Sequence, residues 1–284
     1  MVTTTTMLRD LVEQLGGDAV AVQSLVGVGA DPHTFQPKPG SARAVATSDL
    51  VVTSGLSLEG WIDDLIHNAG GERPVIVASE GVDPIRMEAF KAGVDPHFWF
   101  DTSLWAVAAT NVASGLDRLF TTRPEAQKRI AQNLKRYLIE LEKLNAWTRS
   151  QLETIPADQR VLVTSHDAFN YFGRAFGLEV VGIQGLSTES EASQRDVVRV
   201  IDLVKKRAVP AVFVESSVNR ALIKRVASET GAAVRGPLFS DSLGDTEGPA
   251  GTYVGMVSEN VRVITEGLNG RFQPLKGSIV ADAP

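Results

Sequence analysis

One segment in the middle of the chain constrains the fold more than any other. From Pro124 to about Thr154, no glycine or proline follows the first residue. Apolar residues recur along it at helical spacing, at Ala126, Ile130, Leu134, Leu138, Leu141, Leu144 and Leu152. Pro124 suits a first helical turn and Pro156 forbids continuation. About 31 helical residues would span roughly 46 Å, which is too long for one small α/β layer. The segment is therefore predicted to be one helix that runs along two lobes and joins them; two helices broken near Ala146-Trp147 are the alternative.

The residues on either side alternate between strand-like and helix-like patterns. In the first half, short β-rich runs and a closing helical pattern occupy 21–26, 50–53, 74–78 and 102–119. In the second half, strands and helices alternate at 161–164, 179–183, 193–207, 211–214, 219–229, 233–235 and 253–268. Apolar strands separated by helices indicate buried parallel sheets. The predicted fold is α/β, with an N-terminal α/β lobe at 1–122, a linking helix at 123–155 and a C-terminal α/β lobe at 156–284.

Composition excludes several classes of function. A net charge of −6 without an extended basic run makes nucleic acid or an anionic membrane surface a poor partner. The absence of cysteine removes disulfides, thiolate zinc sites and cysteine nucleophiles together. No run of about 18 apolar residues predicts a transmembrane helix. Met1 is followed at once by a strand-like run, Val2 to Thr6, so we expect that a targeting segment has been removed from the start.

The histidines carry the strongest functional signal. The chain has four, and two of them lie in the same triplet, at Asp31-Pro32-His33 and Asp95-Pro96-His97. His166 ends a strand-like run, and Asp241 lies in a later loop rich in Gly and Ser. All four positions are strand ends or loops, where ligands bind in open α/β sheets. Three imidazoles and one carboxylate suit a first-row divalent metal. We therefore predict that His33, His97, His166 and Asp241 form one metal site in the cleft between the lobes.

Nearby acidic residues have more than one interpretation. Asp31 and Asp95 either accept a hydrogen bond from a ring N–H of the neighbouring histidine or act only as turn residues. Glu215, at the end of a strand, is interpreted as a carboxylate that supports a ligand from behind. A weak fifth ligand and a partner for an arginine in the cleft are the alternatives for Glu215. His67 is interpreted as a residue at a helix C-terminus and is excluded from the site.

Longer motifs surround these residues. They are GADPHTFQP at 29–37, DPHFWFD at 95–101, VTSHDAFNYFGRAFGLEVVGIQGLSTESEAS at 163–193, AVFVESSV at 211–218, and LFSDSLG with GTYVGM within 238–256. Through these specific motifs, which extend over nearly the whole chain, the sequence resembles the cluster A-I metal-binding (solute-binding) proteins of bacterial ABC importers, specifically the TroA-like manganese and zinc subgroup. The resemblance implies two α/β lobes joined by one long rigid helix. It also implies that His33, His97, His166 and Asp241 are the metal ligands.

The resemblance leaves the metal open between zinc and manganese. The family's zinc-specialised branch often carries a long loop rich in His and acidic residues between the first two ligand histidines, whereas the stretch Glu80–Val94 is short and has no histidine. The iron and manganese branch often has Glu where this chain has His166. Imidazole ligands favour zinc, while ligation through both oxygens of Asp241 would favour manganese. Ligand chemistry favours zinc by a small margin.

Three functions remain compatible with the residues. The expected one is a monomeric extracytoplasmic protein, periplasmic or lipid-anchored, that captures Zn²⁺ or Mn²⁺ and delivers it to the membrane permease of an ABC importer. The second is a metal-dependent hydrolase that uses a three-histidine site, with Asp167 or Glu215 as base. The third is an adhesin or scaffold whose metal is structural. We expect the first, which is not an enzyme and has no nucleic-acid partner.

Overall fold

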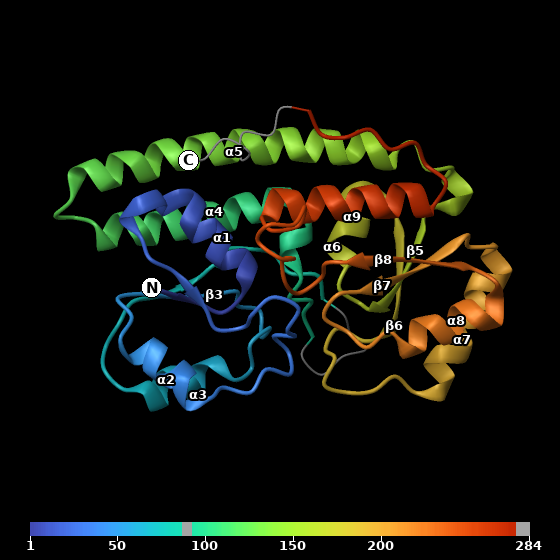
Figure 1. Ribbon diagram of the computed structural model, residues 1–284, viewed down its shortest axis with the longest axis horizontal. Helices are drawn as coiled ribbons and strands as arrows, with labels where there is room; N and C mark the ends of the chain where they lie inside the picture. Colours follow the sequence, from blue (N-terminus) through green and yellow to red (C-terminus); the bar gives the residue numbers. More distant parts are fainter. Residues whose placement is uncertain (87–92, 277–284) are drawn as a thin grey trace.

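Two α/β lobes lie side by side beneath one long helix, α5, in the computed structural model (Figure 1). The structure describes residues 1–86 and 93–276. Helix α5 runs from Pro124 to Leu152, so one continuous helix is confirmed and the alternative of two helices is wrong. Its 29 residues span about 43 Å at about 1.5 Å per residue, which is enough to extend over both lobes.

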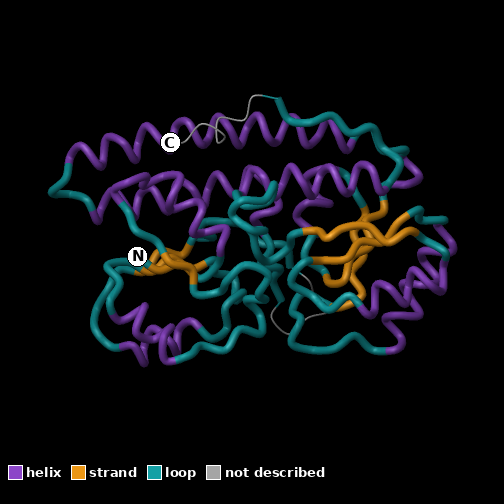
Figure 2. The backbone as a smooth tube through the Cα atoms, viewed as in Figure 1, coloured by secondary structure: helices purple, strands orange, loops and turns teal. Residues whose placement is uncertain are grey.

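The first lobe contains a parallel sheet with strand order β2-β1-β3-β4 and helices on both faces (Figures 1 and 2). The strands are β1 (Val2–Thr3), β2 (Gln23–Ser24), β3 (Val51–Thr53) and β4 (Val75–Val77). The helices are α1 (Thr6–Gly16), α2 (Pro39–Ala46), α3 (Ile62–Ala69) and α4 (Thr102–Leu119), with 3-10 turns at Gly17–Ala19 and Phe98–Phe100. Val45, Ile62 and Leu65 attach α2 and α3 to one face, and α1 and α4 cover the other. Apolar strands buried on both sides account for this layering.

The second lobe repeats the parallel arrangement. Its strands are β5 (Val161–His166), β6 (Glu179–Gln184), β7 (Ala211–Glu215) and β8 (Ala233–Leu238). Its helices are α6 (Asn170–Phe176), α7 (Gln194–Arg207), α8 (Ala221–Thr230) and α9 (Tyr253–Gly267), with a 3-10 turn at Ala157–Gln159. Strand β5 pairs with β6, β7 pairs with β8, and β5 lies beside β7. Strand β8 continues past its predicted end at Arg235.

Alternate residues of β5 face two different hydrophobic cores. Val161 and Val163 pack into a cluster with residues of α7 and α8, whereas Leu162 belongs to the larger cluster that includes residues of α5 and α9. Strand side chains point alternately to opposite faces of a sheet, so one apolar run supplies both cores. The carboxyl ends of β5 and β7 are thereby held firmly where the lobes meet.

Helix α5 packs against both halves of the chain. It contacts α1 and α4 of the first lobe and α6 and α9 of the second. Asn133 Nδ2 donates a hydrogen bond to the carbonyl oxygen of Leu15, and Trp147 Nε1 donates to that of Gln273. The two lobes therefore share one rigid support, while the residue boundaries proposed for the three parts of the chain stay a prediction. Within the described residues, no helix has both the length and the hydrophobicity needed to cross a bilayer.

A buried carboxylate, Asp10, connects the lobes where α9 begins. Asp10 lies on α1, and its Oδ2 accepts a hydrogen bond of 2.9 Å from the backbone N–H of Tyr253, the first residue of α9. Its Oδ1 accepts a hydrogen bond of 3.2 Å from Gln14 Nε2. Burial raises the pKa of Asp10 from 3.8 to about 6; Glu13 also raises this pKa, and Arg9 lowers it.

Asp10→Asn is expected to flatten the pH dependence of stability between about pH 4 and pH 6. In this window the folded Asp10 keeps a proton that the unfolded chain has lost, because burial raises its folded-state pKa to about 6. The contribution of Asp10 to the free energy of unfolding is therefore largest below about pH 4 and declines as pH rises to about 6. At about 1.4 kcal/mol per pK unit, the decline amounts to about 3 kcal/mol. Urea unfolding of both proteins at several pH values measures it, and equal slopes would contradict the raised pKa.

Candidate metal centre

Four side chains from four segments meet between the lobes. His33 lies in the loop after β2, and His97 directly precedes the 3-10 turn that leads into α4. His166 is the last residue of β5, and Asp241 lies in the loop after β8. Their potential ligand atoms all lie within 4.8 Å of one another. His33 is 7% exposed and the other three side chains are fully buried. The structure thus brings together all four residues that the sequence predicts, and His67, on α3, does not belong to the cluster.

The separations within the cluster suit one small metal ion. His33 Nε2 lies 3.2 Å from His97 Nε2. His97 Nε2 lies 3.5 Å from Asp241 Oδ1, and His166 Nε2 lies 3.6 Å from Asp241 Oδ2. Tetrahedral zinc, with bonds of about 2.0–2.2 Å, places neighbouring ligand atoms about 3.3–3.6 Å apart. These three separations are therefore close to those of a four-coordinate metal site, and all four ligand atoms lie within 4.8 Å of one another.

Asp95 orients the imidazole of His97. Asp95 Oδ1 lies 2.8 Å from His97 Nδ1 and accepts a hydrogen bond of 2.9 Å from the backbone N–H of the same residue. Asp95 Oδ2 accepts a hydrogen bond of 3.0 Å from Asn170 Nδ2 in the second lobe. A proton held on Nδ1 leaves the lone pair of Nε2 directed into the cluster, as a metal ligand requires. Of the two interpretations of this aspartate, the ring-orienting one agrees with the geometry.

Asp31 has a different role, although its triplet is identical. Its Oδ1 accepts a hydrogen bond of 2.8 Å from the backbone N–H of His33, which is the bond of a turn residue. Its Oδ2 accepts a hydrogen bond from the hydroxyl of Thr188, which lies across the cleft in the second lobe. Asp31 therefore fixes the loop around His33 and links it to the other lobe.

Glu215 lies behind His166. Its Oε2 lies 2.6 Å from His166 Nδ1, and its Oε1 accepts a hydrogen bond of 2.9 Å from the backbone N–H of His166. Nδ1 and Nε2 lie on opposite sides of an imidazole ring, and Nε2 is the atom that faces Asp241. We therefore propose that Glu215 supports the ligand and is not itself a fifth ligand.

Electrostatics in the cluster favour the charged forms of His97 and His166 beside the charged form of Asp241, whereas His33 is held neutral. Burial lowers the pKa of His166, but Glu215 and Asp241 outweigh it and raise this pKa well above its ordinary value. Burial likewise opposes the charged form of His97, but Asp95 and Asp241 raise its pKa. Burial raises the pKa of Asp241, but His166 and its other histidine neighbours hold it well below its usual range. Burial lowers the pKa of His33 to about 3. An arriving metal ion must displace protons from this cluster. The affinity of the cluster for metal therefore decreases as the pH is lowered.

Glu215→Gln is expected to weaken zinc binding about 10- to 100-fold. This is the usual loss of affinity when a residue that hydrogen-bonds to a metal-ligating side chain is replaced. Gln offers one acceptor oxygen, so either the Nδ1–H or the backbone N–H of His166 loses its partner. The imidazole is then less firmly oriented and less basic. Competition with a chromophoric chelator measures the dissociation constant, with Glu247→Gln at an exposed position as the matched control. Equal affinities of the two variants would exclude a supporting role for Glu215.

Sequence reasoning missed two serines that contact Asp241. Ser217 Oγ lies 2.8 Å and Ser240 Oγ lies 3.0 Å from Asp241 Oδ2, and both hydroxyls are placed to donate hydrogen bonds to it. Ser240 is the chain neighbour of Asp241, and Ser217 follows β7. Nothing in their local sequence distinguishes them from the other serines nearby, because their importance depends on distance in space.

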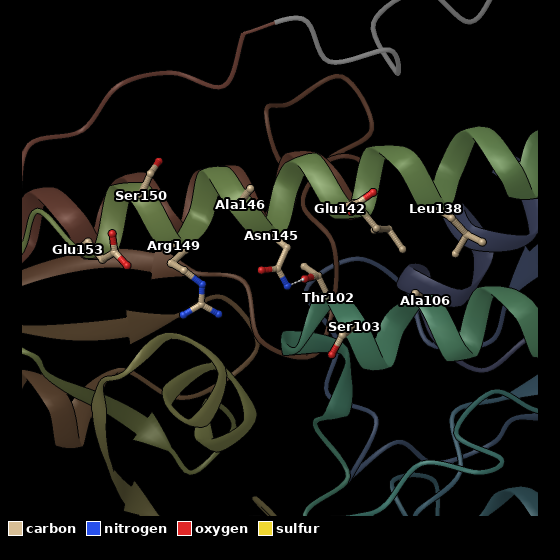
Figure 3. A pocket seen from close by; sticks show the side chains of 11 residues that line it. Thr102, Ser103, Ala106, Leu138, Glu142, Asn145, Ala146, Arg149, Ser150 and Glu153 are labelled. Atoms are coloured by element: carbon tan, nitrogen blue, oxygen red, sulfur yellow. Dashed lines mark hydrogen bonds between the residues drawn. The ribbon is translucent and has the colours of Figure 1, made fainter.

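A surface hollow between α4 and α5 is separate from the cluster (Figure 3). None of the four clustered residues belongs to its lining. Asn145 Nδ2 donates a hydrogen bond of 2.6 Å to Thr102 Oγ1, and Arg149 Nη2 donates one of 3.0 Å to the carbonyl oxygen of Ala175. These polar groups are already paired within the chain, so we assign the hollow no binding function.

The sequence prediction that the protein is not of the zinc-specialised branch rests on the short stretch 80–94. Residues 87–92 of this stretch lie outside the described residues, so the prediction stays a prediction.

The chain is similar to known metal-binding proteins over almost its whole length. The model of the ZnuA family, described as zinc-uptake complex component A periplasmic, matches residues 1–267. The manganese-binding lipoprotein MntA of Bacillus subtilis (strain 168) is 37% identical over 272 residues, covering 93% of this chain and 88% of that protein. The zinc-binding protein TroA of Treponema pallidum (strain Nichols) is 37% identical over 275 residues, covering 94% of this chain and 88% of that protein. The solved structure of the periplasmic zinc-binding protein TroA from Treponema pallidum has a TM-score of 0.88 at 36% identity, covering 94% of this chain and 98% of that one.

Proposed function

Because the chain belongs to the ZnuA family of zinc-uptake component A proteins, we propose that it captures a divalent transition metal, zinc or manganese, and delivers it to the permease of an ABC importer. The observation that carries the proposal is the buried cluster of three histidines and one aspartate, with all four ligand atoms within 4.8 Å. Four protein ligands shield an ion from water and from competing ligands. Such a site suits cargo that has to be held during transfer.

The same geometry gives no support to the hydrolase alternative. A catalytic zinc site keeps one coordination position open for water and needs a base near that water. Here a fourth protein ligand would take the open position. The two bases considered for a hydrolase are also engaged: Asp167 Oδ1 accepts a hydrogen bond of 2.8 Å from the backbone N–H of Gly182, and Glu215 holds His166. We propose that the protein is not an enzyme.

The names of the relatives support an extracytoplasmic location. MntA is named as a lipoprotein, and the family description and the TroA structure name periplasmic proteins. We propose that this chain also acts outside the cytoplasm, as a monomer, with a metal ion and an ABC permease as its partners and no nucleic-acid partner. Sedimentation of the purified chain with and without metal tests the monomer, and a stable dimer in either state would contradict it.

Elemental analysis of the purified protein tests the proposed cargo. We expect about one zinc or manganese ion per chain, removed by a chelator while the circular dichroism spectrum stays unchanged, and rebound after the chelator is dialysed away. Competition between the two metals then ranks their affinities. A chain that neither contains nor rebinds metal would refute the proposal and leave the family fold without the family function.

A further inference from the structure

The two carboxylate oxygens of Asp241 have different surroundings. Oδ2 is contacted by two hydroxyl groups, Ser217 Oγ at 2.8 Å and Ser240 Oγ at 3.0 Å. Oδ1 is buried and is contacted by no hydroxyl or backbone donor within the described part of the chain; a ligand nitrogen, His97 Nε2, lies 3.5 Å away. A buried acceptor without a donor is costly in a folded protein unless another partner, such as a metal ion, takes it. Oδ1 is therefore the oxygen that the fold leaves free for the cargo.

Distance alone does not distinguish the two oxygens. Oδ1 lies 3.5 Å from His97 Nε2 and Oδ2 lies 3.6 Å from His166 Nε2, so both face the ligand nitrogens at similar range. Without further restraint, both oxygens could bind one ion. The difference lies in the two serine hydroxyls, which both contact Oδ2.

Two donated hydrogen bonds use the acceptor capacity of Oδ2. A carboxylate oxygen offers about two lone-pair positions. The two hydroxyls also lie 3.1 Å from each other, but each carries a single hydrogen. The charged oxygen is the stronger acceptor, so both hydrogens are directed to Oδ2. A metal ion can then bind Oδ2 only by displacing one of these bonds.

The fold holds these serines in place through their backbones. Ser240 is fully buried, and its carbonyl oxygen accepts a hydrogen bond of 3.0 Å from Trp99 Nε1 in the first lobe. The preceding residue, Phe239, exchanges two hydrogen bonds with the side chain of Asn260 on α9. Ser217 lies two residues after the end of β7. The hydroxyls are thus positioned by elements that do not depend on the metal.

We propose that Ser217 and Ser240 are specificity-determining residues that hold Asp241 to a single coordinating oxygen and thereby favour zinc over manganese. The inference rests on the proposed function. Three imidazole nitrogens and one oxygen form a four-coordinate site, the arrangement that zinc prefers. A second oxygen from Asp241 would raise the coordination number and the oxygen content, both of which favour manganese.

The test compares Ser217→Ala, Ser240→Ala and the double variant with the unmodified chain. Dissociation constants for zinc and for manganese are measured separately by chelator competition, and their ratio is the readout. We expect the double variant to lose about tenfold or more of its preference for zinc over manganese, within the range of effects of residues behind a ligand. The visible spectrum of the Co²⁺-loaded protein is a second readout. We expect intense bands of four-coordinate Co²⁺ in the unmodified chain and weaker bands of higher coordination in the double variant.

Two matched variants separate this role from a general loosening of the loop. Ser242→Ala removes a hydroxyl from the same loop, one that accepts a hydrogen bond of 2.9 Å from the backbone N–H of Gly29. It is expected to leave the ratio and the spectrum unchanged. Ser217→Thr keeps a hydroxyl and is expected to behave like the unmodified chain. If the double variant does not fold, the Ser217→Ala single variant, at a position that is not fully buried, decides by the same two readouts.

The outcomes separate this inference from the proposed function. Metal binding with the same zinc-to-manganese ratio and the same Co²⁺ spectrum in all variants would overturn the role of the serines and leave metal capture intact. An equal shift in Ser242→Ala would also overturn it, because the loop and not the two hydroxyls would then be responsible. No metal binding by the unmodified chain would overturn the proposed function and this inference with it.

Discussion

Replacing Asp241 by alanine is expected to weaken zinc binding by at least about 10²-fold. Replacing a residue that hydrogen-bonds to a metal-ligating side chain lowers metal affinity about 10- to 100-fold, and replacing the ligating side chain itself lowers it more. Asp241 is also the only carboxylate among the four clustered residues, so alanine leaves the ion with three imidazoles and no negatively charged ligand. In a fully buried site, water does not readily replace that charge.

The same variant separates metal capture from the hydrolase alternative. A catalytic site of three histidines would not need Asp241 for binding, so most of the affinity would survive Asp241→Ala. Zinc competition against a chelator provides the measurement. Asp245→Ala is the matched control, since it removes an exposed carboxylate from the same loop. Equal zinc affinities of these two variants would exclude Asp241 as a ligand.

Saturation with metal is expected to raise the melting temperature by roughly 6–16 °C while the metal-free protein stays folded. Free zinc at about 100 to 1,000 times the dissociation constant stabilises the folded state by about 3–4 kcal/mol. For a chain somewhat larger than 250 residues, about 1 kcal/mol corresponds to about 2–4 °C. Three clusters of buried hydrophobic residues fill the lobes, and none of them contains a side chain of the proposed site. Because the hydrophobic cores do not include the metal site, we expect the fold to persist without metal.

This melting experiment also tests the alternative in which the metal is structural. A scaffold that needs its metal would unfold in chelator at moderate temperature, as metal-dependent small domains do. Calorimetry with chelator and with excess zinc gives both melting temperatures, and far-ultraviolet circular dichroism reports the fold of the metal-free chain. Asp241→Ala with excess zinc is the control, because it should lose most of the shift. Loss of the fold on metal removal would replace capture by a structural role.

Much of the fold could be predicted because its signals are local. The stretch without Gly or Pro after Pro124 predicts α5, since helical periodicity and breakers act within a few residues. Short apolar runs that alternate with helical patterns predict the strands, and this signal too is local. The short helices α2 and α3 had weaker signals, because each has only 8 residues and depends on packing against the sheet.

The candidate site was predictable to the level of its four clustered side chains. Histidine is rare in this chain, and a repeated triplet with proline marks two of the four. For the carboxylates around them, the sequence named candidate roles but could not choose between the alternatives, because these roles depend on residues far away in the sequence. Asp95 and Asp31 share a triplet, yet Asp95 meets Asn170 and His97 while Asp31 meets Thr188.

The sequence by itself therefore determined the long helix, the parallel α/β layers and the identity of the four candidate ligands. These follow from periodicity, chain breakers and the scarcity of one residue type, all of which can be read along the chain. Only the tertiary structure decided that Glu215 lies against Nδ1 of His166 and that Ser217 and Ser240 contact one oxygen of Asp241. The hydrogen bond between Glu215 and His166 joins residues 49 positions apart. Such a contact depends on how strand ends and lobes meet, and no local pattern encodes that meeting.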